Sequence, residues 1–198
     1  MRALAILIIA LSLAIYHYVT TRPIDHPAGV LVAKDPEQSE PVALAPISDR
    51  DFKLQPRARF AADVRVLSEE RYHLGKLADI APLDIAVGWG RMSDSAVLAN
   101  LDISQGNRFY YWHYDDQPPI PREEIQTHSA NWHLLPANNG IWSTLKRIRV
   151  GEIVHLEGLL VDIDSPETGT IRTSTTREDT GAGACEVIYV ESVALEAN

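Results

Sequence analysis

The chain is poor in cysteine and in basic residues, and each shortage excludes a class of protein. Its single cysteine, Cys185, cannot form an internal disulfide and cannot build a multi-cysteine zinc or iron–sulfur site. Lys and Arg number 18 against 27 Asp and Glu, which gives a formal net charge of −9. Because nonspecific binding to nucleic acid depends on neutralising phosphates with basic side chains, we expect no nucleic-acid partner.

The rest of the composition is typical of a globular chain. Hydrophobic residues make up 45% and charged residues 23% of the 198 residues, which excludes wholesale disorder, collagen and a long coiled coil. We find no repeat of fixed period and no phosphate-binding or metal-ligand motif, so no cofactor and no metal are expected. The length suits one ordinary domain with about 50 residues outside it.

An apolar run opens the chain. Residues 3–19 carry no acidic or basic charge, and a helix of that length measures about 26 Å, just sufficient for a bilayer core. The run predicts an uncleaved, single-pass transmembrane signal anchor over residues 1–20, which contacts the membrane through residues 3–19. The rest of the protein would then be extracytoplasmic (periplasmic). The alternatives are a cleaved signal peptide and a buried helix.

Prolines are concentrated in the following segment. Residues 20–57 hold six of the twelve prolines, and each proline removes a backbone donor and restrains the preceding residue to extended geometry. This predicts a Pro-rich tether over residues 21–57 and a globular domain over residues 58–198. The short apolar stretch at 29–32 could also dock on that domain as an edge strand, although a plain spacer is the simpler interpretation.

The predicted domain contains helices and strands. Capping and proline signals predict helices over residues 79–89, 93–98 and 121–134. Apolar alternation predicts a strand over residues 59–67, and a turn at Gly106-Asn107 predicts a hairpin.

From residue 150 onward the sequence is β-rich. We therefore predict an α+β domain, with a small curled antiparallel sheet or barrel and two or three short helices. Residues 150–162 resemble a strand pair of an oligonucleotide/oligosaccharide-binding (OB) barrel, with an SH3-like barrel as a related possibility. A resemblance at the level of fold implies no function.

Cys185 is the first candidate for chemistry. A glycine-rich loop precedes it, which would let the backbone approach a ligand closely. As a nucleophile it would need a histidine base and a polar residue that orients the base. The candidates for these two roles are His128, His133, Asn131 and Asp179. The alternatives are a buried thiol, favoured by the neighbouring Glu186, and a mixed disulfide with a partner.

Aromatic residues supply the second candidate. Residues 109–114 are all aromatic or histidine, and on a strand alternate side chains face opposite ways. One face would then pack in the core, and the other could stack on a sugar, peptide or base. A further tryptophan lies between two glycines near an arginine. The candidate binding residues are Tyr110, Trp112, Tyr114, Trp89 and Arg91.

These observations favour a membrane-tethered, extracytoplasmic interaction module that binds a protein or glycan partner in the cell envelope. The first alternative is an enzyme, a Cys–His thiol hydrolase that acts on an acyl or peptide bond. The second is a structural scaffold without a ligand. Whether the protein is an enzyme stays open at this point.

Overall fold

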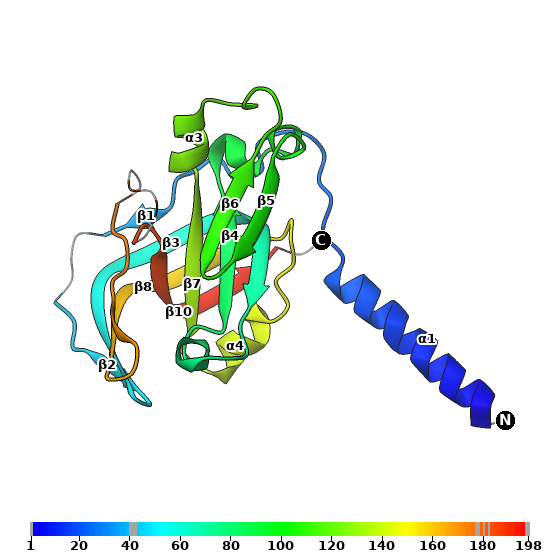
Figure 1. The fold of residues 1–198 in the computed structure, drawn as a ribbon, viewed down its shortest axis with the longest axis horizontal. Coiled ribbons are helices and arrows are strands. Elements are labelled where there is room, and N and C mark those ends of the chain that lie inside the picture. Colours follow the sequence, from blue (N-terminus) through cyan, green and yellow to red (C-terminus); the bar gives the residue numbers. More distant parts are fainter. Residues whose placement is uncertain (1, 40–42, 177–178, 180, 182, 197–198) are drawn as a thin grey trace.

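A five-stranded closed barrel forms the centre of the molecule (Figure 1). The computed structural model describes residues 2–39, 43–176, 179, 181 and 183–196, apart from the side chains of residues 2–5, 16 and 17. Around the ring, neighbouring strands are β3 (Phe52–Arg71), β4 (Leu83–Gly88), β7 (Ser129–Pro136), β10 (Glu186–Leu195) and β8 (Ile153–Ser165). Because β8 pairs with β3 again, the sheet closes on itself.

The length of β3 makes this closure possible. The strand has 20 residues; it pairs with β8 from Lys53 to Arg65 and with β4 from Arg65 to Arg71. The β7–β10 pair is parallel, whereas the other four pairs in the ring are antiparallel. Three short strands extend the sheet outside the ring: β1 (Glu37–Gln38), β2 (Ile47–Asp49) and β9 (Gly169–Ile171).

The barrel interior is filled by alternate apolar side chains of all five strands. Trp132 is fully buried there and meets Phe60 edge-on, with the ring centroids 5.3 Å apart. One end is closed by α4 (Asn139–Leu145), which begins where the Asn138 side chain accepts hydrogen bonds from two backbone N–H groups. Leu145, at the end of α4, is buried in the same core.

A β-hairpin covers the outer face of β4 and β7 (Figure 1). It consists of β5 (Asp102–Gly106) and β6 (Phe109–His113), and it follows two short helices, η2 (Gly90–Ser93) and α2 (Ser95–Leu98). A second apolar cluster, the hairpin core, joins the hairpin to the barrel wall. Its buried members are Leu67, Ala86, Met92, Val97, Leu101, Ile120 and Ile125.

The predicted α+β class is wrong, because the domain is mostly sheet with a few short helices. The predicted helix at 79–89 is not formed: η1 (Lys76–Asp79) ends at its first residue, and most of the range is strand β4. The predicted helix at 121–134 ends early, as α3 (Arg122–Thr127), and continues as β7. Both strands are buried on both faces, so they lack the alternation that distinguishes a strand from a helix in sequence.

Other local predictions are confirmed. The hairpin turns at Gly106-Asn107, where Asn107 adopts a positive φ of 54°. The helix predicted over residues 93–98 is present as α2, and Asp94 caps it by accepting a hydrogen bond from the backbone N–H of Ala96 at 2.8 Å. The β-rich region after residue 150 contains β8, β9 and β10.

The N-terminal helix α1 (Arg2–Thr21) projects away from the barrel (Figure 1). Among the residues that the structure describes, none of the helices combines the length and the hydrophobicity that a membrane crossing needs. The apolar run is interrupted by Ser12 and ends at Thr20, short of the roughly 20 apolar residues typical of a span. This finding contradicts the predicted transmembrane signal anchor over residues 1–20. The predicted single-pass topology with an extracytoplasmic (periplasmic) domain depended on that span and is contradicted with it.

The segment after α1 runs along the domain surface and is attached to it at several points. The backbone N–H of Ile24 donates to the carbonyl of Val150 at 2.8 Å. The N–H of Val32 donates to Ser93 Oγ at 3.0 Å, and the Val32 side chain is buried in the barrel core. The predicted boundaries at residues 20 and 57 stay a prediction.

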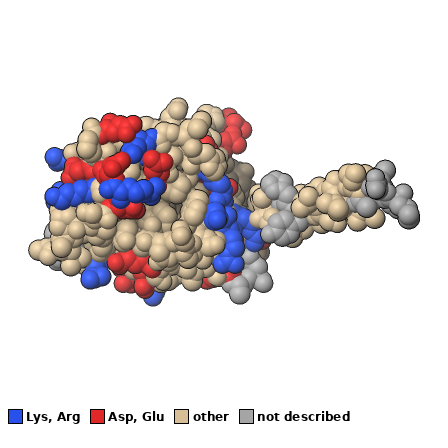
Figure 2. All heavy atoms as spheres, turned by 90° about the horizontal axis from the view of Figure 1, so that it is seen from below, with Lys and Arg blue, Asp and Glu red and all other residues tan. Residues whose placement is uncertain are grey.

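Basic side chains gather on the domain beside the base of α1 (Figure 2). A shallow cavity between the end of α1 and the domain is lined there by Arg71, Lys146 and Arg149. The Arg149 guanidinium also donates to the carbonyl of Val19 at 3.3 Å. These side chains therefore lie against the helix end.

Candidate functional site

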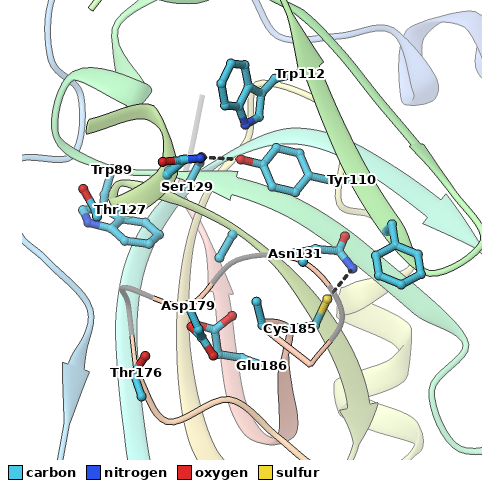
Figure 3. Close-up of a pocket in the computed structure, with 15 residues that line it drawn as sticks. Trp89, Tyr110, Trp112, Thr127, Ser129, Asn131, Thr176, Asp179, Cys185 and Glu186 are labelled. Carbon is cyan, nitrogen blue, oxygen red and sulfur yellow. Dashed lines mark hydrogen bonds between the residues drawn. The ribbon is translucent and has the colours of Figure 1, made fainter. Parts of the chain in front are cut away.

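A cavity of about 170 Å³ opens between the β5–β6 hairpin, β7 and the segment that precedes β10 (Figure 3). The described part of that segment, called here the β9–β10 segment, comprises residues 172–176, 179, 181 and 183–185. The cavity is lined by Trp89, Phe109, Tyr110, Trp112, Gln126, Thr127, Ser129, Ala130, Asn131, Thr176, Asp179, Gly181, Ala184, Cys185 and Glu186.

Aromatic rings form one side of the cavity. Trp112 and Tyr110 project from alternate positions of β6, and both pack partly on the hairpin core. The Tyr110 hydroxyl is hydrogen-bonded to Ser129 Oγ on β7, which ties the hairpin to the barrel wall. Burial raises the pKa of Tyr110 to about 12, so this hydroxyl stays protonated at neutral pH. The wall is therefore aromatic and uncharged.

Carboxylates lie on another side of the cavity. Asp179, in the β9–β10 segment, accepts a hydrogen bond from Ser174 Oγ at 2.7 Å. Glu186, the first residue of β10, is 4% exposed. None of the described residues that line the cavity is Lys or Arg. The local field therefore favours a neutral or cationic ligand over an anionic one.

Cys185 lies half-buried beside Asn131 (Figure 3). Its thiol accepts a hydrogen bond from Asn131 Nδ2 at 3.7 Å and donates to the carbonyl of Arg108 at 3.9 Å. The position follows from the parallel pairing of Glu186 with Trp132. Since Cys185 immediately precedes that pair, it reaches the outer face of β7, where Asn131 is found.

The outer face of the barrel next to Cys185 carries an ionisable group of three residues. Asp84 is buried on β4 and lies in register with His133 on β7. Its Oδ1 is 2.9 Å from His133 Nδ1 and 2.8 Å from Arg108 Nη1. Arg108 comes from the hairpin turn and has its guanidinium carbon 3.5 Å from the Tyr72 ring centroid. The group thus joins the hairpin to two barrel strands.

His133 has a strongly altered proton affinity. Burial alone lowers its pKa, but the interactions with Asp84 and with the thiol of Cys185 outweigh burial and raise the pKa to about 9. The imidazole therefore carries a positive charge at neutral pH. This charge lies beside the Asp84 carboxylate, with Nδ1 2.9 Å from Oδ1.

The structure brings most of the predicted site residues into one place. Trp89, Tyr110, Trp112, Asn131, Asp179 and Cys185 line the cavity, and His133 lies two residues beyond Asn131 on β7, beside Asp84. The residues predicted separately for binding and for catalysis therefore share a site.

Three predicted residues lie elsewhere. His128 packs near Trp89 and has Nε2 4.0 Å from Asp35 Oδ1. Arg91 forms a two-point ion pair with Glu124. Tyr114 stacks on Trp112, with ring centroids 6.1 Å apart, on the hairpin core. None of these three is among the described residues that line the cavity.

Two important residues were missed by sequence reasoning, Asp84 and Arg108. Asp84 interrupts an apolar stretch that reads as a helix, so its carboxylate was not assigned to a barrel face. Arg108 lies in a turn, where an arginine ordinarily faces solvent. A lone acid inside a fully buried strand, as in Leu83–Gly88, is the signal that could have drawn attention to Asp84.

No group of three or more His, Cys, Asp or Glu side chains suited to a metal ion is found among the described residues. Compared with models of protein families, with curated proteins and with solved structures, the chain shows no match.

Proposed function

We propose that the protein is a binding module whose cavity receives a basic side chain of a protein or peptide partner. The observation that carries this proposal is the combination of Trp112 and Tyr110 with Asp179 and Glu186 in one cavity. Aromatic faces attract cations through their quadrupole, and carboxylates form charge-assisted hydrogen bonds with ammonium and guanidinium groups. The net charge of −9 favours encounter with a basic partner.

The size of the cavity limits what enters it. A volume of about 170 Å³ is below the roughly 300–1,000 Å³ of sites that hold drug-sized ligands. One side chain of a larger partner fits this limit better than a whole cofactor does. The Trp112 ring already has the guanidinium of Arg122 5.5 Å from its centroid, which is an internal example of the contact proposed.

A titration of the full-length protein with short blocked peptides tests this function. Acetyl-Gly-Arg-Gly-amide is expected to bind about tenfold more tightly than acetyl-Gly-Glu-Gly-amide, because a hydrogen bond to a charged group contributes roughly 1.5–3 kcal/mol. Calorimetry measures both affinities. Raising the salt concentration should lower the affinity for the arginine peptide, because salt screens the charges of a partly open site.

Two variants locate the binding. Asp179→Asn removes one charge from the cavity and should lower the affinity for the arginine peptide. Glu196→Gln removes one charge from an exposed residue near the C-terminus and should leave that affinity unchanged. Equal affinity for the two peptides, equal affinity for a neutral sugar such as glucose, or an unchanged affinity in Asp179→Asn would each contradict the proposal.

A further inference from the structure

One edge of strand β7 faces the cavity. β7 pairs with β4 from its first residue, Ser129, whereas among the described residues β10 joins the other edge only at Trp132. The three residues before that point, Ser129, Ala130 and Asn131, line the cavity (Figure 3). This stretch, residues 129–131, is called here the β7 edge. A strand edge beside open space is a template for pairing with another chain.

We propose that the partner is an extended peptide segment that adds a short parallel strand to the β7 edge. Its basic residue lies opposite Ala130, donates its backbone N–H to the carbonyl of Ser129 and accepts from the N–H of Asn131. The inference rests on the proposed function for the basic side chain, and it adds the conformation in which the partner binds. In strand addition, main-chain hydrogen bonds supply affinity and side-chain pockets supply specificity.

Two hydrogen bonds show which way the backbone groups of β7 point. Just before the strand, the carbonyl of His128 accepts from the N–H of Trp89, which directly follows β4, at 3.1 Å. Just after it, the N–H of Ala137 donates to the carbonyl of Val190 on β10 at 3.1 Å. Backbone groups of successive residues in a strand point alternately to its two edges. The even-numbered residues of β7 therefore direct theirs to β4, and the odd-numbered residues direct theirs to the opposite edge.

The described residues that precede β10 do not take up this edge. In a continued parallel ladder, the N–H of Ala184 would donate to the carbonyl of Ser129, because Ala184 would lie opposite Ala130. It donates instead to the carbonyl of Gly181 at 3.2 Å. Gly181 and Ala184 line the cavity together with Ser129 and Ala130, so the cavity occupies the place that a continued strand would take.

The register also places the basic side chain. Residues that pair across neighbouring strands share a face of the sheet, so a residue opposite Ala130 lies on the face that carries Trp132 and its partner Glu186. An arginine at this position extends toward the Glu186 carboxylate, which lines the cavity and is 4% exposed. The residues before and after it face the other way, where Tyr110 is hydrogen-bonded to the Ser129 side chain. Charge complementarity therefore favours a basic residue at the central position.

Backbone amide signals of the full-length protein in NMR test the pairing directly. In the free protein the N–H of Asn131 should exchange with solvent faster than the N–H of Ala130, which points to β4. Addition of acetyl-Gly-Arg-Gly-amide should move the Asn131 amide proton downfield, because that group gains a hydrogen bond, and should move the Ala130 amide proton less. Equally slow exchange of the two amides in the free protein would mean that another part of the chain already pairs with the β7 edge, and would overturn the inference.

Two isomeric peptides separate the backbone contact from the side-chain contact. Acetyl-Gly-(N-methyl-Arg)-Gly-amide lacks the N–H that donates to the carbonyl of Ser129. Acetyl-Gly-Arg-Gly-N-methylamide has the same atomic composition and keeps that N–H, so it is the matched control. By calorimetry the first peptide should bind about fivefold or more weakly than the second, because it loses one backbone hydrogen bond. Both changes lie in the peptide, so the protein fold is unaffected, and equal affinities would overturn the inference.

Failure of the inference and failure of the proposed function are distinguishable. Suppose that acetyl-Gly-Arg-Gly-amide binds more tightly than acetyl-Gly-Glu-Gly-amide, but the two isomers bind equally and the Asn131 signal does not move. That result refutes strand addition alone. A moved Asn131 signal with equal affinities for the arginine and glutamate peptides refutes the preference for a basic side chain alone. If none of these peptides binds, both proposals are refuted.

Discussion

Replacing Asp84 by Asn removes the charge that holds His133 and Arg108 on the barrel wall. The Asp84 side chain is 1% exposed and contacts both partners within 3 Å. Asn has nearly the same shape, so the substitution changes charge more than packing. The loss should therefore appear as a change in how stability depends on pH.

The magnitude of this pH dependence follows from the pKa of His133, which has a reference value of 6.5 and is about 9 in the folded protein. A difference of about 2.5 pKa units corresponds to roughly 3–4 kcal/mol, at roughly 1.4 kcal/mol per unit. Because the folded-state pKa is the higher one, this stabilisation is fully present below about pH 6.5 and is lost as the pH rises through about 9. Asp84 shares the raising of this pKa with Cys185, against burial, so the deficit of Asp84→Asn should be largest near pH 6 and should shrink by a few kcal/mol at most near pH 10.

Urea unfolding at the two pH values, followed by tryptophan fluorescence, measures this difference. Asp63→Asn is the matched control, since Asp63 pairs with His155 at 2.8 Å but both side chains are about half exposed. An exposed pair contributes no more than about 1 kcal/mol. If the deficit of Asp84→Asn is the same at both pH values, or no larger than that of Asp63→Asn, the reasoning is refuted.

Two further pairs of substitutions test the fold. A Cβ at Gly158 would lie 2.1 Å from the carbonyl oxygen of Tyr189, so Gly158→Ala should destabilise the barrel by about 2 kcal/mol or more in urea unfolding, while Gly106→Ala, with open space around it, should change stability by less than about 0.5 kcal/mol. Val32→Ala should cost about 2 kcal/mol because that side chain is 5% exposed, and Val30→Ala, at 46% exposed, should be near neutral. Reversal of either order would contradict the packing described.

The parts of the fold that depend on local signals were predictable from sequence. The Gly106-Asn107 turn and the cap at Asp94 each follow from residues close together in the chain. The identity of β4 and β7 was not predictable in this way. Both strands are covered on one side by the barrel core and on the other by the hairpin, which packs on Ala86 of β4 and hydrogen-bonds to Ser129 and Asn131 of β7. Their buried residues therefore follow no period of two.

The candidate site was predictable in its parts but not in its assembly. Cys185, His133 and the aromatics of β6 stand out by residue type alone. That they share one place depends on the parallel pairing of β10 with β7 and on the hairpin folding back over β4. The β7–β10 pairing joins segments about 50 residues apart in the chain, and the position of the hairpin depends on how it packs on β4. Local sequence patterns carry no information about either arrangement.

The most direct test of the proposed binding follows the indole N–H signals of the tryptophans by NMR as acetyl-Gly-Arg-Gly-amide is added. Trp112 lines the cavity, whereas Trp142 lies on α4 at the closed end of the barrel. A saturable shift of the Trp112 signal with an unmoved Trp142 signal is the predicted result. An unmoved Trp112 signal, or equal movement of both signals, would contradict it.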